Sequence, residues 1–295
     1  MTVPHPIPYQ GSKRKLASDI LVHFPNQLNT LYEPFSGSAA LTLSAAYFHK
    51  AKNYCISDCL SPLIEIWQMI LKHPDELAKQ YHEIWYQQLG NEKEFYAQIR
   101  NEYNRDHEPA KLLYLIARCV KNSIRFNSSG DFNQSPDNRR KGMHPDKMKH
   151  NILGAHHLLK DSTKAVSADY SEMLDKAKSG DLVYMDPPYQ GVSNKRDPRY
   201  YEQLDFDKFV NELDKLNKKN VDYIVSFDGS CGNKVYGSDL PKYLELTKID
   251  VIAGRSSQAT LNGSDDITIE SLYLSRNIAP KAKSKQLKLF ELSAV

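Results

Sequence analysis

The segment LVYMDPPYQG, residues 182–191, carries the residues of this sequence best suited to chemistry. Its apolar residues predict a β-strand, which must end at Asp186 because prolines follow. Pro187 and Pro188 lack a backbone N–H, so nearby carbonyl groups stay free to accept hydrogen bonds from a ligand. Asp186 and an adjacent carbonyl could hold both hydrogens of a planar amino group, and Tyr189 offers a ring on which a base can stack. A chance turn is the alternative, but the segment favours a site for an amino group on a flat ring.

A second candidate site lies in LYEPFSGSAALT, residues 31–42, where an apolar run ends at Glu33. Small residues around Gly37 follow Phe35 and lead into a predicted helix. Small residues let a ligand approach the backbone, and the start of a helix presents free N–H groups. The pattern is compatible with a cofactor loop and with an ordinary turn.

A third candidate is Asp58, which ends the apolar run NYCISD. An acid in this place typically binds the ribose hydroxyls of a nucleoside cofactor. Alternatively, Asp58 caps a helix that begins near Pro62.

Short β-like runs must position these residues, and they alternate with helix-like stretches along the chain. The runs are TLYEPF, NYCISD, KAVSAD, DLVYMD, DYIVSF, KIDVIA and SLYLS. Strands that alternate with helices predict a doubly wound α/β sheet. Ligands of such sheets bind at the carboxyl ends of the strands, where the acids named above lie.

The alternation breaks between Ser61 and about Asn122, where the pattern is helical throughout. After it, SSGD lies between short polar and aromatic pieces, which suggests a hairpin, and a basic loop follows. Between Arg118 and His150, eight Lys or Arg face three Asp, which indicates a phosphate-binding surface or a merely solvated loop. The expected organisation is an α/β domain formed by residues 1–59 and 162–278, a helical insertion with a basic hairpin at 60–161, and a flexible basic tail at 279–295.

Composition bounds the class of protein. With 295 residues, 40% of them apolar, and a net charge of +3, the chain can bury a sizeable core. It has no apolar run of membrane-spanning length and no signal-peptide pattern, so we expect a cytoplasmic protein. The four cysteines lack the spacing of a zinc site, so we expect free thiols and no metal.

Taken in order, the motifs resemble those of the Dam-like, class-alpha, AdoMet-dependent DNA adenine-N6 methyltransferases (AdoMet, S-adenosyl-L-methionine). PYQGSKRKL looks like the N-terminal AdoMet motif, EPFSGSA like the glycine loop, ISDC like the ribose-binding acid, SADYSEML like the motif whose acid faces the cofactor adenine, and DPPY like the catalytic motif. The sequence departs from the family at Ala39, where a second glycine is common. The resemblance implies a Rossmann-like methyltransferase sheet. It implies cofactor contacts from Tyr9, Lys13, Glu33, Phe35, Gly37, Asp58 and Asp169, and a catalytic motif formed by Asp186, Pro187, Pro188 and Tyr189.

The activity that the resemblance implies is transfer of a methyl group from AdoMet to the amino nitrogen of a flipped adenine in duplex DNA. The Asp186 carboxylate and the Pro187 carbonyl would favour a pyramidal nitrogen whose lone pair points at the methyl group. The enzyme would act on specific sites as a modification enzyme of a restriction-modification pair, and thus near the nucleoid. An adenine-N6 methyltransferase that acts on RNA and a non-catalytic DNA-binding module are the alternatives.

The segment IRFNSSGDFN is similar to the recognition hairpin of the same family. Arginine pairs with guanine and asparagine with adenine in the major groove, which favours base contacts from Arg125, Asn127 and Asn133. We expect phosphate contacts from the basic run Arg139, Arg140 and Lys141. Another basic stretch after the catalytic motif could close over a flipped base or be a plain surface loop; it contains Lys195, Arg196 and Arg199.

The tail contains KQLKLFE, which matches a short peptide pattern by which bacterial proteins dock on the replication sliding clamp. The matching residues are Gln286, Leu287, Leu289 and Phe290. A flexible tail can place two apolar anchors in a groove and become ordered only on binding. The alternative is an amphipathic turn that packs on the body of the protein. A cognate restriction enzyme is a further expected partner.

Overall fold

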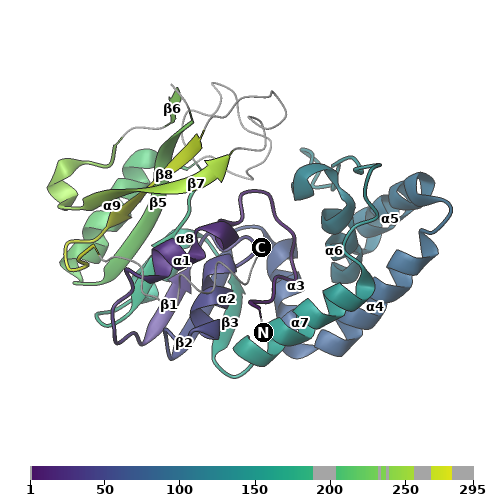
Figure 1. Ribbon diagram of the computed structural model, residues 1–295, viewed down its shortest axis with the longest axis horizontal. Coiled ribbons are helices and arrows are strands. Elements are labelled where there is room, and N and C mark those ends of the chain that lie inside the picture. The colour runs from purple at the N-terminus through teal and green to yellow at the C-terminus, as the bar shows by residue number, and fades with distance from the viewer. Residues whose placement is uncertain (1, 189–203, 232–233, 237–238, 256–266, 281–295) are drawn as a thin grey trace.

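The fold is built on an eight-stranded mixed sheet (Figure 1). The computed structural model describes residues 2–188, 204–231, 234–236, 239–255 and 267–280. The strands are β1 (Thr30–Glu33), β2 (Asn53–Asp58), β3 (Thr163–Ser167), β4 (Leu182–Met185), β5 (Asp222–Cys231), β6 (Lys234–Tyr236), β7 (Thr247–Arg255) and β8 (Ile267–Leu274). Their order is β3-β2-β1-β4-β5-β8-β7, with β6 paired to β5. The pairings among β1 to β5 are parallel, whereas β8 is antiparallel to β5 and β7.

Helices cover both faces of this sheet (Figure 1). The α-helices are α1 (Ala17–Leu21), α2 (Ala40–Tyr47), α3 (Ser61–Lys72), α4 (Pro74–Gln87), α5 (Glu92–Asp106), α6 (Pro109–Arg118), α7 (Pro145–Leu159), α8 (Tyr170–Lys176) and α9 (Phe206–Lys218). Short 3-10 helices are η1 (Lys13–Lys15), η2 (Val120–Asn122) and η3 (Lys242–Leu244). One apolar cluster joins the sheet to α8 and α9, and the other joins it to α1, α2, α3 and α7.

Strand β4 shows why the run before the predicted catalytic motif is apolar throughout. Leu182 and Tyr184 belong to the cluster on one face, while Val183 and Met185 belong to the cluster on the other. Successive side chains of a strand point to opposite faces, and here both faces are covered by helices. Four consecutive buried residues therefore deliver Asp186 to the edge of the sheet.

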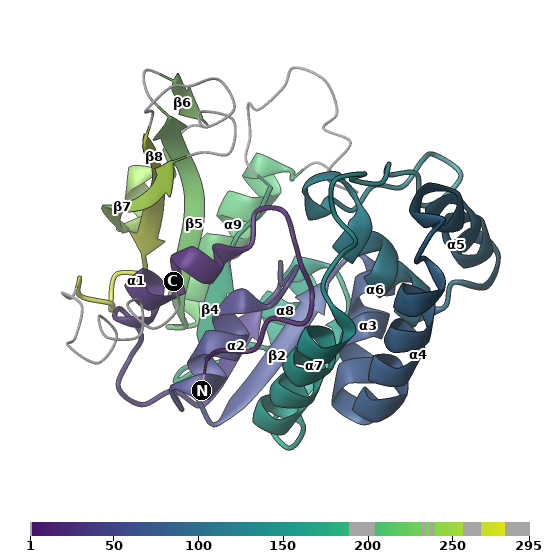
Figure 2. The ribbon, with the colours of Figure 1, turned by 45° about the vertical axis from the view of Figure 1, so that its right-hand side comes forward.

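The helical segment between β2 and β3 shares its core with one face of the sheet. Helix α3 contacts both β2 and β3, α7 contacts α2, α3 and α4, and α4 to α6 stack outside them. Helix α3 is amphipathic, and its buried face includes Leu63, Ile66, Trp67 and Ile70. Figure 2 shows α4, α5 and α6 projecting beside the sheet, with the N-terminal segment passing between the two.

A hairpin after η2 extends from this helical segment. Phe126 and Phe132 form an antiparallel bridge, and their rings meet edge to face with centroids 5.7 Å apart. Gly130 lies in the turn at φ +84°, where glycine is favoured.

The predicted doubly wound α/β architecture is confirmed, and each of the seven predicted strands forms. Strand β6 was not predicted, because three residues are too short for a recognisable alternation. The antiparallel placement of β8 was not predicted either, since periodicity carries no information about strand direction. Within the described part of the chain, none of the helices combines the length and the apolar character needed to cross a membrane.

Candidate active site

Four acids gather where parallel strands end at one edge of the sheet. Glu33 ends β1 and Asp58 ends β2, while Asp169 follows β3 and Asp186 follows β4. Strand β1 is paired in parallel with β2 and β4, and β2 with β3, so the carboxyl ends of these strands lie at the same edge. The fold thus brings together acids that are up to 153 positions apart in the sequence, where ligands of such sheets bind.

The glycine loop between β1 and α2 is held by contacts to its backbone. Gly37 lies at φ +48° and donates its N–H to Asp58 Oδ2 at 3.1 Å. Its carbonyl accepts a hydrogen bond from Trp67 Nε1 at 3.2 Å. A Cβ at Gly37 would lie 2.9 Å from Cε1 of Tyr9, so the ring of Tyr9 packs directly on the glycine. Tyr9, Gly37 and Asp58, predicted from three separate motifs, are therefore in one contact chain.

Asp58 joins the loop to the next turn through both carboxylate oxygens. Besides the bond from Gly37, its Oδ1 accepts the N–H of Leu60 at 3.0 Å. Burial raises the pKa of Asp58, while these backbone hydrogen bonds oppose that shift. Leu60 occupies the N-cap position of α3, so the alternative prediction, that Asp58 caps this helix, is wrong.

An aromatic cluster lies beside Asp169. Phe35 and Tyr170 stack with ring centroids 5.1 Å apart, and Phe209 contacts both rings edge to face. Asp169 caps α8 by accepting the N–H of Ser171. Flat rings next to a carboxylate are groups that can hold a purine and its amino group.

The carboxylate of Asp169 is 40% exposed and forms an ion pair with Lys208 Nζ at 3.3 Å. Burial raises its pKa, but hydrogen bonds from Ser171 and the charge of Lys208 bring the pKa below its ordinary value. Asp169 is therefore ionised and accessible at neutral pH. Sequence reasoning named Phe35 and Asp169 but missed Tyr170 and Phe209; the ring directly after the acid was the available signal for Tyr170.

Lys13 connects the N-terminal motif to the catalytic motif. Its ammonium lies 3.1 Å from Asp186 Oδ1 and 2.8 Å from Glu270 Oε2, on β8. The exposed fractions of the three side chains are 8% for Lys13, 22% for Asp186 and 17% for Glu270. Lys13 was predicted as a cofactor contact, and in the structure it forms ion pairs with these two acids. Glu270 was missed, although an acid within the apolar run ITIESLYL was a signal.

Two of the acids at this edge have strongly raised pKa values. Burial raises the pKa of Asp186 to about 6; the ammonium of Lys13 opposes the shift, and the carboxylate of Glu270 adds to it. Burial likewise raises the pKa of Glu33 to about 7, against hydrogen bonds from Thr42. Glu33 is 4% exposed, and its Oε2 accepts the N–H of Thr42 in the first turn of α2 at 2.9 Å. Carboxylates with such shifts at the end of a strand are typical of functional sites.

The rest of the catalytic motif is described only in part. Pro187 is buried and Pro188 half-buried, directly after Asp186. Tyr189 lies outside the described residues, as do Lys195, Arg196 and Arg199 of the basic stretch that follows.

The three residues predicted to contact bases lie on the hairpin. Asn127 shapes the turn: its Oδ1 accepts the N–H groups of Ser129 and Asp131, each at 2.9 Å, and its Nδ2 donates to Asp131. Asn133 is exposed and donates its backbone N–H to the Arg125 carbonyl at 3.0 Å. The Nε of Arg125 is buried and has no hydrogen-bond partner among the described residues. Arg125 thus has an unsatisfied donor and Asn133 an exposed side chain, whereas the side chain of Asn127 is occupied within the turn.

The basic run after the hairpin carries acidic partners. Asp137 accepts from Arg139 Nε at 3.2 Å and from Arg140 Nε at 2.9 Å. Lys141 lies 2.8 Å from Glu92. The side chains of Arg139, Arg140 and Lys141 are nevertheless 84%, 46% and 54% exposed, so each can reach a phosphate.

Arg118, also in the basic stretch, has a different place. It is 1% exposed, and its guanidinium donates to the carbonyls of Glu92 and Asp137. Arg118 therefore holds the inner side of this segment and is no part of an exposed basic surface.

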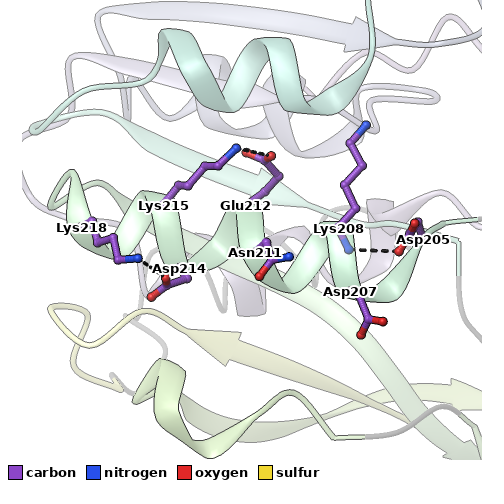
Figure 3. A pocket seen from close by; sticks show the side chains of 8 residues that line it. All are labelled: Asp205, Asp207, Lys208, Asn211, Glu212, Asp214, Lys215 and Lys218. Atoms are coloured by element: carbon purple, nitrogen blue, oxygen red, sulfur yellow. Dashed lines mark hydrogen bonds and ion pairs between the residues drawn. The ribbon is translucent and has the colours of Figure 1, made fainter.

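A hollow on the outer face of α9 does not extend this site. Figure 3 shows that its lining is the polar side of an amphipathic helix, with lysines paired to acids. Lys215 lies 2.7 Å from Glu212, and Lys218 lies 2.6 Å from Asp214. The side chains of Lys215 and Lys218 are 54% and 74% exposed, and ion pairs made by such exposed lysines are typical of a solvated helix face.

Comparison with known proteins gives a consistent family. The model of a family described as D12 class N6 adenine-specific DNA methyltransferase matches residues 9–255. Modification methylase StsI of Streptococcus sanguinis is 29% identical over 235 residues, which are 76% of this chain and 35% of StsI. Type II methyltransferase M.FokI of Planomicrobium okeanokoites is 26% identical over 234 residues, with the same two shares. Retron Ec67 DNA adenine methylase of Escherichia coli is 26% identical over 265 residues, 85% of this chain and 87% of that protein. The chain thus spans about a third of the length of the first two relatives.

Proposed function

This chain belongs to the D12 class N6 adenine-specific DNA methyltransferases, and on that premise we propose that it transfers a methyl group from AdoMet to the exocyclic amino nitrogen of adenine in duplex DNA. The observation that carries the proposal is Asp186, a largely buried carboxylate at the end of β4, directly before two prolines. Its position matches what recognition of an amino group requires.

The residues around the glycine loop fit AdoMet. The ring of Tyr9 fills the space that a Cβ at Gly37 would take, so the absent side chain lets the N-terminal motif pack directly on the backbone of the loop. Asp58, which ends β2, is the candidate partner of the ribose hydroxyls. The ionised Asp169 and the ring of Phe35 suit the cofactor adenine and its amino group. When bound, AdoMet supplies an electrophilic methyl group on a positively charged sulfur.

The catalytic motif would prepare the target nitrogen. An adenine amino group is a poor nucleophile because its lone pair is delocalised into the ring. Hydrogen bonds from that group to the Asp186 carboxylate and the Pro187 carbonyl favour a pyramidal nitrogen with an available lone pair. Catalysis then needs positioning and electrostatics, and no covalent intermediate.

Reaching this nitrogen in a duplex requires the adenine to be flipped, at a cost on the order of a few kcal/mol. Stacking on Tyr189 and the hydrogen bonds to the catalytic motif would offset that cost. Residues 60–161 are the proposed target-recognition insertion, with Arg125 and Asn133 contacting bases and Arg139, Arg140 and Lys141 contacting phosphates. Asn127 would act indirectly, by shaping the turn.

Two partners besides DNA belong to the proposal. The name of StsI as a modification methylase supports a cognate restriction enzyme. The QLKLF sequence of the tail, residues 286–290, supports docking on the sliding clamp, and these residues lie outside the described part. Both partners would place the enzyme at the nucleoid.

Methyl transfer to RNA is the competing activity. The family and the named relatives favour DNA. Labelled AdoMet offered with duplex DNA and, separately, with ribosomal RNA decides between them, since an RNA enzyme would label only the second.

The central test is Asp186→Ala. We expect methylation of plasmid DNA from a host without adenine methylation to fall below detection, because the amino group loses its acceptor. AdoMet affinity, measured by calorimetry, should stay close to that of the native protein. Full activity in this variant would overturn the proposed mechanism.

A further inference from the structure

The candidate for a further role is Glu270, which lies on β8 and contacts the catalytic motif through Lys13. The Lys13 ammonium lies between the two carboxylates, 2.8 Å from Glu270 and 3.1 Å from Asp186. All three groups are mostly buried. A lysine shared by two acids in such surroundings is a single electrostatic unit, in which removal of one member changes the charge felt by the others.

The backbone that presents Glu270 is closely packed. Glu270 is opposite Gly229 on β5 and Val251 on β7. A Cβ at Gly229 would lie 2.5 Å from the carbonyl oxygen of Ile269, so β5 and β8 approach each other closely at this point. Glu270 therefore projects from a fixed position in the sheet, not from a loop.

The charge balance of the unit suits the proposed reaction. Asp186 and Glu270 carry two negative charges against the single positive charge of Lys13, so the unit is net negative. In methyl transfer the nitrogen–methyl bond forms as the sulfur–methyl bond breaks, so a neutral thioether leaves and the amino nitrogen carries a positive charge until it loses a proton to water. A net negative unit next to the nitrogen stabilises that charge. Without Glu270, Lys13 would neutralise Asp186 one to one and weaken it as an acceptor.

We propose that Glu270 is a positioning residue for methyl transfer, which holds Lys13 on one oxygen of Asp186 so that the carboxylate remains a strong, oriented acceptor for the adenine amino group. This inference rests on the proposed function. It assigns a role to a residue outside the recognised motifs.

The groups that face Asp186 come from three elements. Lys13 reaches it from the N-terminal motif, Glu270 from β8, and the buried Glu33 interacts with it from β1. Loss of the Glu270 charge should lower the pKa of Asp186, because that charge contributes to the raised value. The acidic limb of the rate profile would then move to lower pH.

The experiment compares Glu270→Gln and Glu270→Ala with the native protein. Single-turnover methylation of unmethylated plasmid DNA is measured at saturating AdoMet as a function of pH. We expect Glu270→Ala to lower the plateau rate on the order of 10-fold to 100-fold, as misplaced reacting groups do. Glu270→Gln should recover part of that loss, since its amide oxygen still accepts from Lys13, and both variants should show the limb at lower pH.

Asp250→Asn is the matched control. Asp250 is exposed on β7, next to Glu270's strand, and accepts a hydrogen bond from Ser271 at 3.1 Å. Ser271 and Glu270 are consecutive in β8 and point to opposite faces. The control removes the same charge by the same chemical change, and we expect an unaltered plateau and limb.

Three outcomes would overturn the inference. The first is a plateau rate in Glu270→Ala equal to that of the native protein, and the second is an acidic limb of the rate profile in the isosteric Glu270→Gln at the same pH as in the native protein. The third is a 10-fold loss of AdoMet affinity with an unchanged rate at saturating AdoMet, which would make Glu270 a cofactor ligand. If Glu270→Ala does not fold, as judged by thermal melting, the limb of Glu270→Gln decides. Absence of adenine methylation by the native protein would instead reject the proposed function itself.

Discussion

At the scale of single residues, burial is what makes the acids of this site unusual. Asp186 and Glu33 end neighbouring strands, and taking their carboxylates out of water favours the protonated form of each. Lys13 opposes this effect at Asp186. The pKa of Asp186 is nevertheless raised to about 6, close to neutral pH. The exposed Asp169, whose pKa is lowered, is ionised at neutral pH.

This gives a prediction for the pH dependence of methylation. Asp186 must be a carboxylate to accept strongly from the amino group, and its pKa is raised to about 6. The rate should rise with pH through about 6 and level off above it, because deprotonation produces the active form. Single-turnover rates between pH 5 and 9 at saturating AdoMet would measure this limb, and a flat profile across that range would contradict the assignment.

At the scale of elements, the glycine loop depends on backbone geometry at two positions. Gly37 lies at φ +48° beneath Tyr9, and Ala39 lies at φ +45° at the start of α2. The left-handed region costs a residue with a side chain roughly 1–2 kcal/mol. This conformation is the physical reason why a glycine would suit position 39, where the sequence departs from the family.

Gly37→Ala should therefore impair cofactor binding. The added Cβ would lie 2.9 Å from the Tyr9 ring, which must move, and the left-handed backbone would be strained. We expect AdoMet affinity to fall by at least about 10-fold, equivalent to about 1.4 kcal/mol, as measured by calorimetry. Ala39→Gly is the control, since it relieves the same strain and should bind AdoMet normally; equal affinity in both variants would contradict this account.

The hairpin is the second element for which the structure supports a prediction, since it carries the residues proposed to contact bases. Its turn is fixed by Asn127, while Arg125 and Asn133 lie across from each other on its two arms. Arg125→Ala should relax the preference for one base pair at a cost of about 1–3 kcal/mol in discrimination. Methylation of a set of variant sites would measure it, with Lys141→Ala as a phosphate-contact control that weakens all sites alike. An unchanged preference in Arg125→Ala would exclude the proposed base contact.

At the scale of the whole molecule, the sheet and the helical segment are joined by more than chain connectivity. Their apolar residues form one continuous cluster on the α1–α3 side of the sheet. The N-terminal motif also crosses between them, since Gln10 donates its N–H to the Asn122 carbonyl next to the hairpin. The loop that carries Tyr9 and Lys13 is thus bonded directly to the helical segment at the base of the hairpin.

The tail adds a prediction about partners of the whole protein. If QLKLF docks on the sliding clamp, the full chain should retain the clamp in a pull-down, because Leu289 and Phe290 would supply two apolar anchors. Replacement of both residues by alanine should abolish retention while leaving methylation of plasmid DNA unchanged. A native chain that does not bind the clamp would end this proposal.

Seven of the strands, the acids at their ends and the order of the motifs could be predicted from the sequence, because alternation, prolines and small residues act over a few neighbouring positions. The sequence by itself did not determine which charges meet. Glu270 reaches Lys13 only because β8 inserts between β5 and β7, and Tyr170 stacks on Phe35 only because β3 and β1 end at the same edge. Arg118, counted by sequence among exposed basic residues, is buried for the same reason. Contacts between distant segments, and the burial that shifts a pKa, arise from tertiary packing, which no local pattern encodes.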